Sequence, residues 1–430
     1  MINVGIIGFG TVGAGTAKIL LNNRDIILER TGIDVNLRRI ADLDIKRDRG
    51  IRLARGVLTT DAEAVINDPE IDVVVELIGG TTIAKEVVLK ALKAGKHVVT
   101  ANKALLATYG REIFRTAAAN RLQVGFEASV GGGIPIIKVV REGLVANRIR
   151  AIYGIVNGTT NYILTKMTDE KAEFGEVLKE AQKLGYAEAD PTYDVEGIDS
   201  AHKLAILATL AYGAPYSIRD VHVEGITSIT PMDIEFAREL GYKLKLLAIA
   251  KAGGGGIELR VHPTMVPEDN LISKVDGVYN AVYVEGDAVG STLYYGRGAG
   301  DMPTGSAVVS DIVDIALAVA GCAPARPSLA TTGRKALMKM DDVVSMYYFR
   351  FAALDRPGVL SKISGILGSR NISIISVIQK GRHSGKAVPL VVLTHLARER
   401  DVAAALREIN RLSVVAGKTV CIRVEGRDAD

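Results

Sequence analysis

The opening of the chain combines a short apolar run with a glycine-rich turn. Residues 2–7 are mostly β-branched or apolar and lead directly into Gly8-Phe9-Gly10-Thr11-Val12-Gly13, after which a helical stretch follows. In a strand, turn and helix of this kind, Gly8 permits the tight turn, Gly10 lets the backbone approach a pyrophosphate, and Gly13 lets the helix pack closely. The unpaired N–H groups at the helix start can then hold phosphates. The motif alone also occurs in purely structural turns, so its context decides the interpretation.

Alternating strand and helix patterns continue after this turn. Apolar runs at 35–41, 73–77, 97–100 and 123–126 predict strands, and 83–94 and 104–120 predict helices. This alternation predicts an α/β fold with a doubly wound parallel sheet of the Rossmann type, which binds its ligand at the carboxyl ends of the strands. We therefore expect the residues after those strands to face cofactor or substrate, namely Gly79, Thr81, Thr100, Asn102 and Lys103.

The end of the second predicted strand bears on the choice of cofactor. Asp42 stands where an acidic residue usually accepts hydrogen bonds from the adenosine ribose, which favours NAD. Lys46 and Arg47 follow closely and could instead meet the 2′-phosphate of NADP. The sequence leaves NAD, NADP or dual use open.

Composition and charge exclude several classes of protein. The 430 residues predict two to four domains, and 53 Lys and Arg against 49 Asp and Glu leave a net charge of +4 without a basic run, so we expect no nucleic-acid partner. Cys322 and Cys421 have no metal-binding spacing and are interpreted as thiols in a reducing cytoplasm. The apolar stretches at 204–214 and 315–321 fall short of the roughly 18–20 residues that span a bilayer. We therefore predict a cytoplasmic protein without a membrane segment.

An acid and a lysine in the middle of the chain have the spacing of neighbours on a helix. Asp199 and Lys203 stand at i and i+4. Hydride transfer from a dinucleotide to a carbonyl group builds negative charge on the oxygen, so such a site needs a cation or proton donor. A surface ion pair is the alternative for such a spacing. Just before this pair, the loop at 185–197 carries three carboxylates, which could bind a cationic group or simply be solvated: Glu188, Asp190 and Asp194.

Taken in order, several segments of the chain resemble the homoserine dehydrogenase family, and the match extends over essentially its whole length. The resemblance is to the monofunctional form, because the first predicted strand begins at residue 2. It implies the reversible, nicotinamide-dependent reduction of L-aspartate 4-semialdehyde to L-homoserine in threonine and methionine biosynthesis. The matching segments are 8–13, 100–103, 127–135, 157–162, 185–191 with Asp194, Asp199 and Lys203, 260–264, and 298–300 with Pro303, Thr304, Ser306 and Ala307.

The resemblance also assigns roles to individual residues. It makes Lys203 the proton donor to the carbonyl oxygen, oriented by Asp199, with Lys103 as a second catalytic candidate whose alternative role is to begin a helix. Glu188 would bind the substrate amino group and Asp194 would lie near the reacting centre. Asp190, Thr160 and Tyr162 complete the expected substrate site. The expected cofactor residues are Gly8, Phe9, Gly10, Thr11, Val12, Gly13, Asp42, Gly79, Thr100, Lys103 and Gly305.

A monovalent cation is a further implication of the resemblance. Sodium would be held by Glu127 and by the backbone carbonyls of Val130, Gly132 and Ile134. Hard oxygen ligands from a glycine-rich turn suit such an ion. We expect it to be structural and not redox-active.

The carboxy-terminal part has a pattern of its own. After a break and a predicted linker at 326–344, residues 345–430 show the order βαββαβ of a ferredoxin-like fold. They resemble an ACT domain, which implies an amino-acid effector site at Asp355, Pro357, Gly358, Val359 and Asn371. L-Threonine is the expected effector. We expect this part to be a separate unit whose removal would leave catalysis intact.

Two functions remain open at this point. The favoured one is a regulated homoserine dehydrogenase, active as a homodimer or homotetramer, and the alternative is a catalytically silent amino-acid sensor on a Rossmann scaffold. A sensor would have no need for the set of lysines and carboxylates, which favours the enzyme. The expected domains are 1–130 with a return segment at about 298–325 for the dinucleotide, 131–297 as an α+β part for catalysis and dimerisation, and 345–430 for regulation.

Overall fold

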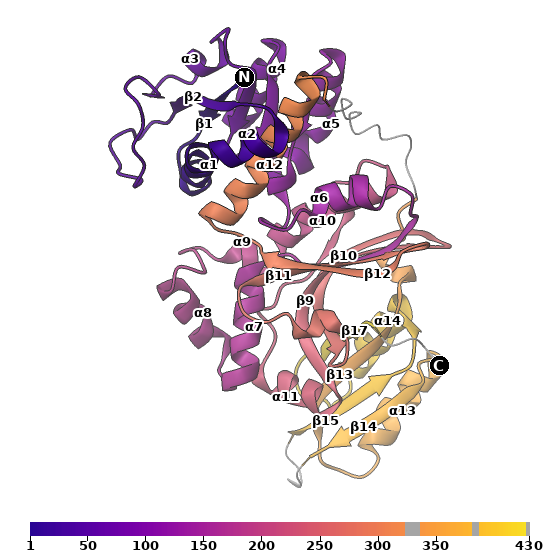
Figure 1. The fold of residues 1–430 in the computed structure, drawn as a ribbon. Coiled ribbons are helices and arrows are strands. Elements are labelled where there is room, and N and C mark those ends of the chain that lie inside the picture. Colours follow the sequence, from indigo (N-terminus) through magenta and orange to yellow (C-terminus); the bar gives the residue numbers. More distant parts are fainter. Residues whose placement is uncertain (323–335, 381–386, 427–430) are drawn as a thin grey trace. The chain divides into compact units, whose positions relative to one another are not determined.

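The computed structural model describes residues 1–322, 336–380 and 387–426 (Figure 1). The chain forms two compact units, each assembled from three segments. The predicted linker at 326–344 and the ends of the return segment and of the ACT part fall partly outside the described residues. The first unit contains 1–158, 199–221 and 278–335, and the second contains 159–198, 222–277 and 336–430.

A six-stranded parallel sheet begins the first unit. Its order, β3-β2-β1-β4-β5-β6, places the first strand in the middle with the chain winding outwards to both sides, which confirms the predicted Rossmann fold. The strands are short, and the central ones, β1 and β4, are mostly apolar and buried because helices cover both faces. They are β1 (Ile2–Ile7), β2 (Val35–Ala41), β3 (Leu58–Thr59), β4 (Val73–Glu76), β5 (His97–Thr100) and β6 (Val124–Gly125).

Two apolar cores lie on the two faces of this sheet. One is formed with α1 and α12 and the other with α3, α4 and α5. A side chain on Gly15 of α1 would lie 2.1 Å from the Asp301 carbonyl oxygen, so α1 and α12 pack at very short range (Figure 1). The helices are α1 (Thr11–Asn22), α2 (Arg24–Thr31), α3 (Glu63–Ile66), α4 (Thr82–Lys93), α5 (Lys103–Ala119) and α12 (Asp301–Val319).

Helix α12 is the one described helix that is long and apolar enough to cross a membrane by length and composition. It is longer than the apolar stretches noted in the sequence. Half of its most apolar window is buried, and its Val308, Ile312 and Ile315 belong to the core against β1 and α1. Its apolar character is therefore accounted for by packing inside the first unit.

The remaining elements of the first unit include the helix that carries Asp199 and Lys203. Strands β7 (Ile149–Ile155), β11 (Tyr279–Gly286) and β12 (Gly290–Arg297) pair antiparallel in the order β12-β11-β7. Helix α10 (Ile198–Tyr212) buries most of its length, including Asp199 and Lys203. The short turns are η1 (Glu127–Ser129), α6 (Ile136–Lys138), η2 (Val139–Gly143) and η3 (Ile218–Asp220).

The second unit joins a helical layer to a mixed sheet. Long strands β9 and β10 pair over their full length, and β8 pairs in parallel with β10. The elements before residue 278 are α7 (Gly158–Glu170), α8 (Phe174–Lys183), α9 (Thr192–Val195), β8 (His222–Val223), α11 (Pro231–Glu239), β9 (Tyr242–Gly253), β10 (Gly256–Pro267) and η4 (Leu271–Lys274).

The carboxy-terminal elements confirm the predicted βαββαβ order. The strands lie in the order β17-β13-β15-β14, and α13 and α14 bury their apolar stripes on one face of this sheet, around Tyr347, Phe349 and Phe351 (Figure 1). The elements are η5 (Met340–Asp342), β13 (Val344–Leu354), α13 (Val359–Ser369), β14 (Ile374–Gln379), β15 (Ala387–Thr394), β16 (Ala397–Arg398), α14 (Glu399–Ile409) and β17 (Val420–Val424).

The ACT part lies in the same compact unit as β9 and β10. Strand β17 pairs in parallel with β10, with Thr264 opposite Arg423, so both parts share one sheet. Leu337, within the predicted linker, also bridges to Ile257 of β10. The pattern of residues 345–430 reveals their own fold but gives no sign of which strand edge they join.

Candidate active site

The glycine-rich turn has the geometry of a phosphate cradle. Gly8 has a φ of 104°, and a Cβ there would lie 2.5 Å from the backbone of Leu77. A Cβ on Gly13 would lie 2.1 Å from the carbonyl oxygen of Gly8, whereas one on Gly10 would meet nothing within 4 Å. No side chain caps the start of α1, so its N–H groups are available to a ligand. The residues present therefore fit a dinucleotide pyrophosphate beside Gly10.

Asp42 is bound to the same turn. Its Oδ2 accepts a hydrogen bond from the Phe9 backbone N–H at 2.5 Å, and its Oδ1 accepts one from the Asp44 N–H at 2.8 Å. The guanidinium of Arg49 lies 4.7 Å from the centre of the Phe9 ring, donates to the Phe9 carbonyl and approaches Asp42 at 3.4 Å. Sequence analysis missed Arg49, because the long loop after β2 gives no sign that it folds back on the glycine turn.

A buried carboxylate, Glu76, organises the strand ends beside the cradle. It is the last residue of β4, is fully buried, and accepts hydrogen bonds from the Thr100 hydroxyl at 2.7 Å and the Ile78 N–H at 2.8 Å. Burial raises its pKa, and the hydrogen bonds oppose that rise. Asn102 caps α5 by accepting from the Leu105 N–H, which fixes the start of the helix that carries Lys103. Glu76 was also missed, since one acid at a strand end has no distinctive spacing.

Lys103, Asp199 and Lys203 form a compact cluster. Asp199 Oδ2 lies 2.6 Å from Lys203 Nζ, and Asp199 Oδ1 lies 3.0 Å from Lys103 Nζ. The Asn157 amide donates to Asp199 Oδ2 at 2.9 Å, and Lys203 also donates to the Val156 carbonyl at 2.6 Å. The predicted i,i+4 pair is thus buried, and the alternative of a surface ion pair does not hold.

The cluster contains more positive than negative charge. Asp199 is 3% exposed, and burial alone would raise its pKa. The two ammonium groups and the Asn157 amide more than offset that effect and hold the pKa of Asp199 well below its usual range. One carboxylate between two ammonium groups leaves a net positive charge, which suits an oxygen that becomes negative during a reaction.

Glu127 lies in the buried turn after β6. It is 1% exposed, and its two carboxylate oxygens accept from the Ile137 and Lys138 N–H groups at 2.8 and 2.9 Å. Burial raises its pKa to about 6, and burial raises the pKa of Asp311, which accepts from the Glu127 N–H, to about 7. The described residues hold no group of three His, Cys, Asp or Glu side chains that could bind a metal. One buried carboxylate beside carbonyl-rich glycine turns therefore fits a cation of low charge better than a transition metal.

Gly305 has a packing role in the structure. It lies in α12, where a Cβ would sit 2.8 Å from the backbone of Gly15 and Thr16 in α1. The close contact of the two helices requires a glycine at this position. Its predicted contact with the cofactor remains a prediction.

The residues expected to bind substrate belong to the second unit. Glu188 and Asp190 are exposed in the loop before α9, and Asp194 is half-buried. Hydrogen bonds from the Thr192 side chain and, to a smaller extent, from its N–H at 3.1 Å lower the pKa of Asp190. Thr160 is buried in the first turn of α7, and the Tyr162 hydroxyl donates to Glu180 at 2.8 Å.

The expected effector turn is open. Gly358 precedes α13 with a φ of 84°, no side chain caps that helix, and a Cβ on Gly358 would meet nothing within 4 Å. Asn371, after the helix, also has a positive φ of 57°. Both positions have the backbone conformation that the turn needs.

Comparisons with known proteins agree with this arrangement. The model of the homoserine dehydrogenase NAD-binding domain matches residues 8–127, that of homoserine dehydrogenase matches 135–313, and that of the ACT domain matches 347–414. Homoserine dehydrogenases of Neisseria gonorrhoeae and Pseudomonas aeruginosa are each 48% identical, covering 99% of this chain and 98% and 99% of theirs.

Solved structures extend the similarity to the fold. The crystal structure of a homoserine dehydrogenase from Thiobacillus denitrificans superposes with a TM-score of 0.94 at 50% identity, over 99% of this chain and 98% of that one. A hyperthermophilic archaeal homoserine dehydrogenase in complex with NADPH superposes with a TM-score of 0.63 at 28% identity, over 74% of this chain and 98% of that one. The open glycine cradle, the buried lysine and aspartate cluster and these similarities together show that the chain belongs to the homoserine dehydrogenase family.

Proposed function

We propose that the cluster of Lys103, Asp199 and Lys203 is where this chain carries out its family's reaction, the reversible reduction of L-aspartate 4-semialdehyde to L-homoserine. The observation that carries the assignment is the burial of one carboxylate between two ammonium groups. The nicotinamide dinucleotide supplies the hydride when bound. Lys203 donates a proton to the aldehyde oxygen, Asp199 holds that ammonium group in place, and Lys103 adds positive charge.

The low pKa of Asp199 defines its role. Because the carboxyl stays ionised at neutral pH, it positions the lysines and does not itself supply the proton. We expect Asp199→Asn to lower kcat by at least about a hundredfold, the lower range for loss of general acid catalysis, while the KM for the dinucleotide stays within twofold. Unchanged kcat in steady-state assays of semialdehyde reduction would reject the assignment.

We propose that the dinucleotide site accepts both NAD and NADP. Gly8, Phe9, Gly10, Thr11, Val12 and Gly13 form its phosphate turn, with Gly79, Thr100, Lys103 and Gly305 further along it. Asp42 favours NAD, whereas Arg49, Lys46 and Arg47 can meet a 2′-phosphate. We expect Arg49→Ala to lower kcat/KM for NADPH roughly tenfold more than for NADH, and Asp42→Ala to shift the ratio the other way. A ratio unchanged in both variants would place the adenosine ribose elsewhere.

We also propose that sodium binds at Glu127 and the carbonyls of Val130, Gly132 and Ile134. A cation there would offset the cost of burying an ionised Glu127, whose pKa burial raises to about 6. The Tm should then rise with NaCl more than with tetramethylammonium chloride at equal ionic strength. Glu127→Gln should abolish that difference.

In this proposal, Glu188 binds the ammonium group of the substrate amino acid. Asp190, Asp194, Thr160 and Tyr162 contribute to substrate binding, because the loop with the exposed and half-buried carboxylates leads directly into α10 along the chain. Glu188→Gln should raise the KM for semialdehyde without a change in the KM for the dinucleotide. We further propose that the protein is cytoplasmic and forms a homodimer or a homotetramer. Light scattering of the purified protein can distinguish these two states. We also propose that L-threonine is the effector of the ACT domain.

A further inference from the structure

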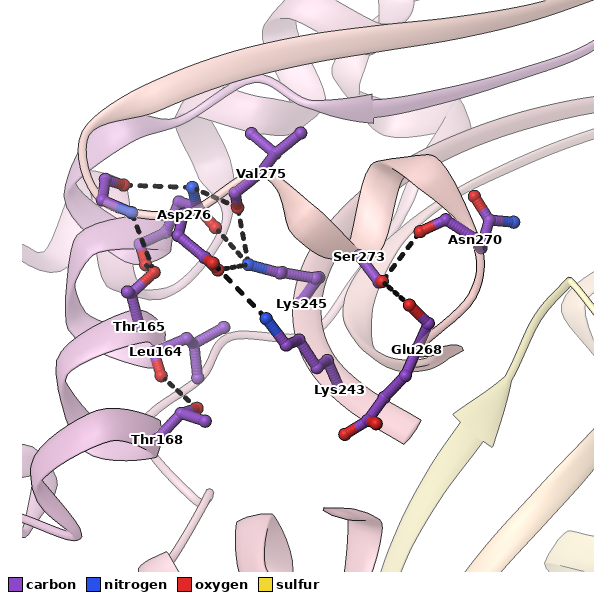
Figure 2. Close-up of polar contacts among 12 residues, drawn as sticks. Leu164, Thr165, Thr168, Lys243, Lys245, Glu268, Asn270, Ser273, Val275 and Asp276 are labelled. Carbon is purple, nitrogen blue, oxygen red and sulfur yellow. Dashed lines mark hydrogen bonds and ion pairs between the residues drawn. The ribbon is translucent and has the colours of Figure 1, made fainter. Parts of the chain in front are cut away.

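Lys245 is a buried lysine of the second unit, with a side chain that is 2% exposed. It contacts α7, the helix that carries the proposed substrate residues Thr160 and Tyr162. It projects from β9, and its ammonium group donates to the Val275 carbonyl at 2.6 Å and to Asp276 Oδ1 at 2.8 Å (Figure 2). It also donates to Asn161 Oδ1 at 3.3 Å. All three donors of the ammonium group are therefore used. Burial lowers the pKa of Lys245, and Asp276 opposes that effect.

Asn161 links this ammonium group to α7. Its amide is buried, accepts from Lys245, and donates to the Val275 and Gly277 carbonyls at 3.1 and 3.0 Å. One turn later, the Thr165 hydroxyl donates to the Asn161 carbonyl at 2.7 Å and accepts from the Gly277 N–H at 3.0 Å. The first two turns of α7 are thus tied to residues 275–277, and Lys245 completes the network (Figure 2).

The position of these contacts on α7 matters for function. Asn161 stands between Thr160 and Tyr162, and α7 begins immediately after Asn157, whose amide contacts Asp199. A displacement of the first turn would move Thr160 by a comparable distance. Misplaced binding groups weaken substrate binding even when the chemical groups are intact.

We propose that Lys245 is a positioning residue for substrate binding, which sets the first turn of α7 through Asn161 and the turn at 275–277. This rests on the proposed function, in which Thr160 contributes to the substrate site. A methionine would fill a similar volume without three donors, so the lysine serves to specify one arrangement of polar groups and is not needed merely to fill space.

The test is Lys245→Met, assayed by steady-state kinetics. We expect the KM for L-aspartate 4-semialdehyde to rise roughly tenfold, with the KM for the dinucleotide within twofold of wild type and kcat within about threefold. Lys243→Met is the matched control, because Lys243 lies on the same strand and pairs with Asp276 at 3.4 Å, but is 31% exposed. It should leave both KM values unchanged.

Two more variants keep the outcomes distinct. Thr160→Val tests the proposed function itself: a raised semialdehyde KM in Thr160→Val together with a normal one in Lys245→Met would overturn only the inference about Lys245. If Lys245→Met lowers the Tm but leaves the semialdehyde KM within twofold, its role is purely structural and the inference fails.

If Lys245→Met does not fold, Asp276→Asn takes its place. Asp276 is 45% exposed, so its neutralisation should be tolerated, and a roughly threefold rise in the semialdehyde KM is expected. An unchanged KM in Asp276→Asn would likewise reject the inference. A raised KM in that variant, with the dinucleotide KM unchanged, would support it.

Discussion

The two units each bury a cluster of charged side chains. The clusters differ in net charge and in how far apart their members lie in the sequence. In the first unit, Asp199 faces two lysines, and its partner Lys203 is only four residues away. In the second, Arg260 contacts Glu258 and Glu425, and Arg423 contacts Glu224 and Glu399. Each arginine there lies between two carboxylates, and the contacts join residues as many as 199 positions apart. The lysine cluster has excess positive charge that can act on a substrate oxygen, whereas the arginine cluster satisfies the donors of its own guanidinium groups and holds strands together.

The largest expected effect tests the lysine cluster. Lys203→Ala should lower kcat by roughly two to four decades, the scale of general acid catalysis, because the proton donor is lost. The free energy of unfolding should change little, since Lys103 and Asn157 still satisfy Asp199. Lys90→Ala, which removes a surface ion pair with Glu63, is the control and should leave kcat unchanged. Activity of Lys203→Ala within a few-fold of wild type would remove the distinction between the clusters.

The arginine cluster should show the opposite result. Arg260 is fully buried, and Arg260→Met removes the guanidinium that Glu258 and Glu425 share, leaving Glu425 its pair with Lys251 at 3.3 Å. The free energy of unfolding should therefore fall by about 3–5 kcal/mol. Urea denaturation measures this loss. The control is Arg400→Ala, whose pair with Asp342 is about half exposed on both sides and should contribute less than about 1 kcal/mol. Equal losses in both variants would show that the buried network does not hold the sheet.

Removal of the whole ACT part also tests how far the second unit depends on the arginine cluster. Removal of residues 345–430 takes away β17 and exposes the edge of β10 together with Arg260. We therefore expect the truncated chain to aggregate or unfold, in contrast to the separable regulatory part that the sequence predicts. A soluble, active truncated chain would restore the original view.

Threonine binding tests whether the turn at Gly358 is an effector site separate from the lysine cluster. Gly358→Asp should weaken threonine binding at least tenfold in isothermal titration. The left-handed backbone at this position is strained for a residue with a side chain, and the aspartate brings a negative charge towards the effector carboxylate. Wild-type inhibition by threonine should be non-competitive with semialdehyde. Equal affinity in both proteins, or competitive inhibition, would move the effector to the catalytic site.

The smallest effect concerns pH. His262 is fully buried beside Arg260, and burial together with Arg423 and Arg260 holds its pKa well below the usual value. The unfolded chain then binds a proton below about pH 6.5 that the folded chain does not, so stability should fall as the pH falls through that range, by up to about 1.4 kcal/mol per pH unit. His262→Gln should flatten the slope in part, since His97 and His202 are shifted in the same direction. An unchanged slope would show that His262 is not buried in its neutral form.

Local patterns explain why the sequence predicts the first unit so well. The glycine turn spans only a few residues, and so does the pair of Asp199 and Lys203. Helix and strand periodicity are therefore enough to place each of them. Arg49 and Glu76 were missed because their partners are brought to them by the fold of the sheet. The pairing of β10 with β17, and the contacts of Arg423 with Glu224, depend on strand edges far apart in the chain, which no local spacing encodes.

The long reach between β10 and β17 also sets an order of events during synthesis. Arg260 leaves the ribosome 165 residues before Glu425, its closest ion partner. Until then Thr264 and Met265 of β10 lack their partner strand, and the Arg260 guanidinium lacks Glu425, which favours contacts with other chains. Closing so distant a strand pair is slow. The second unit should therefore complete its fold late, and its nascent form should depend on chaperones more than the locally wound dinucleotide sheet does.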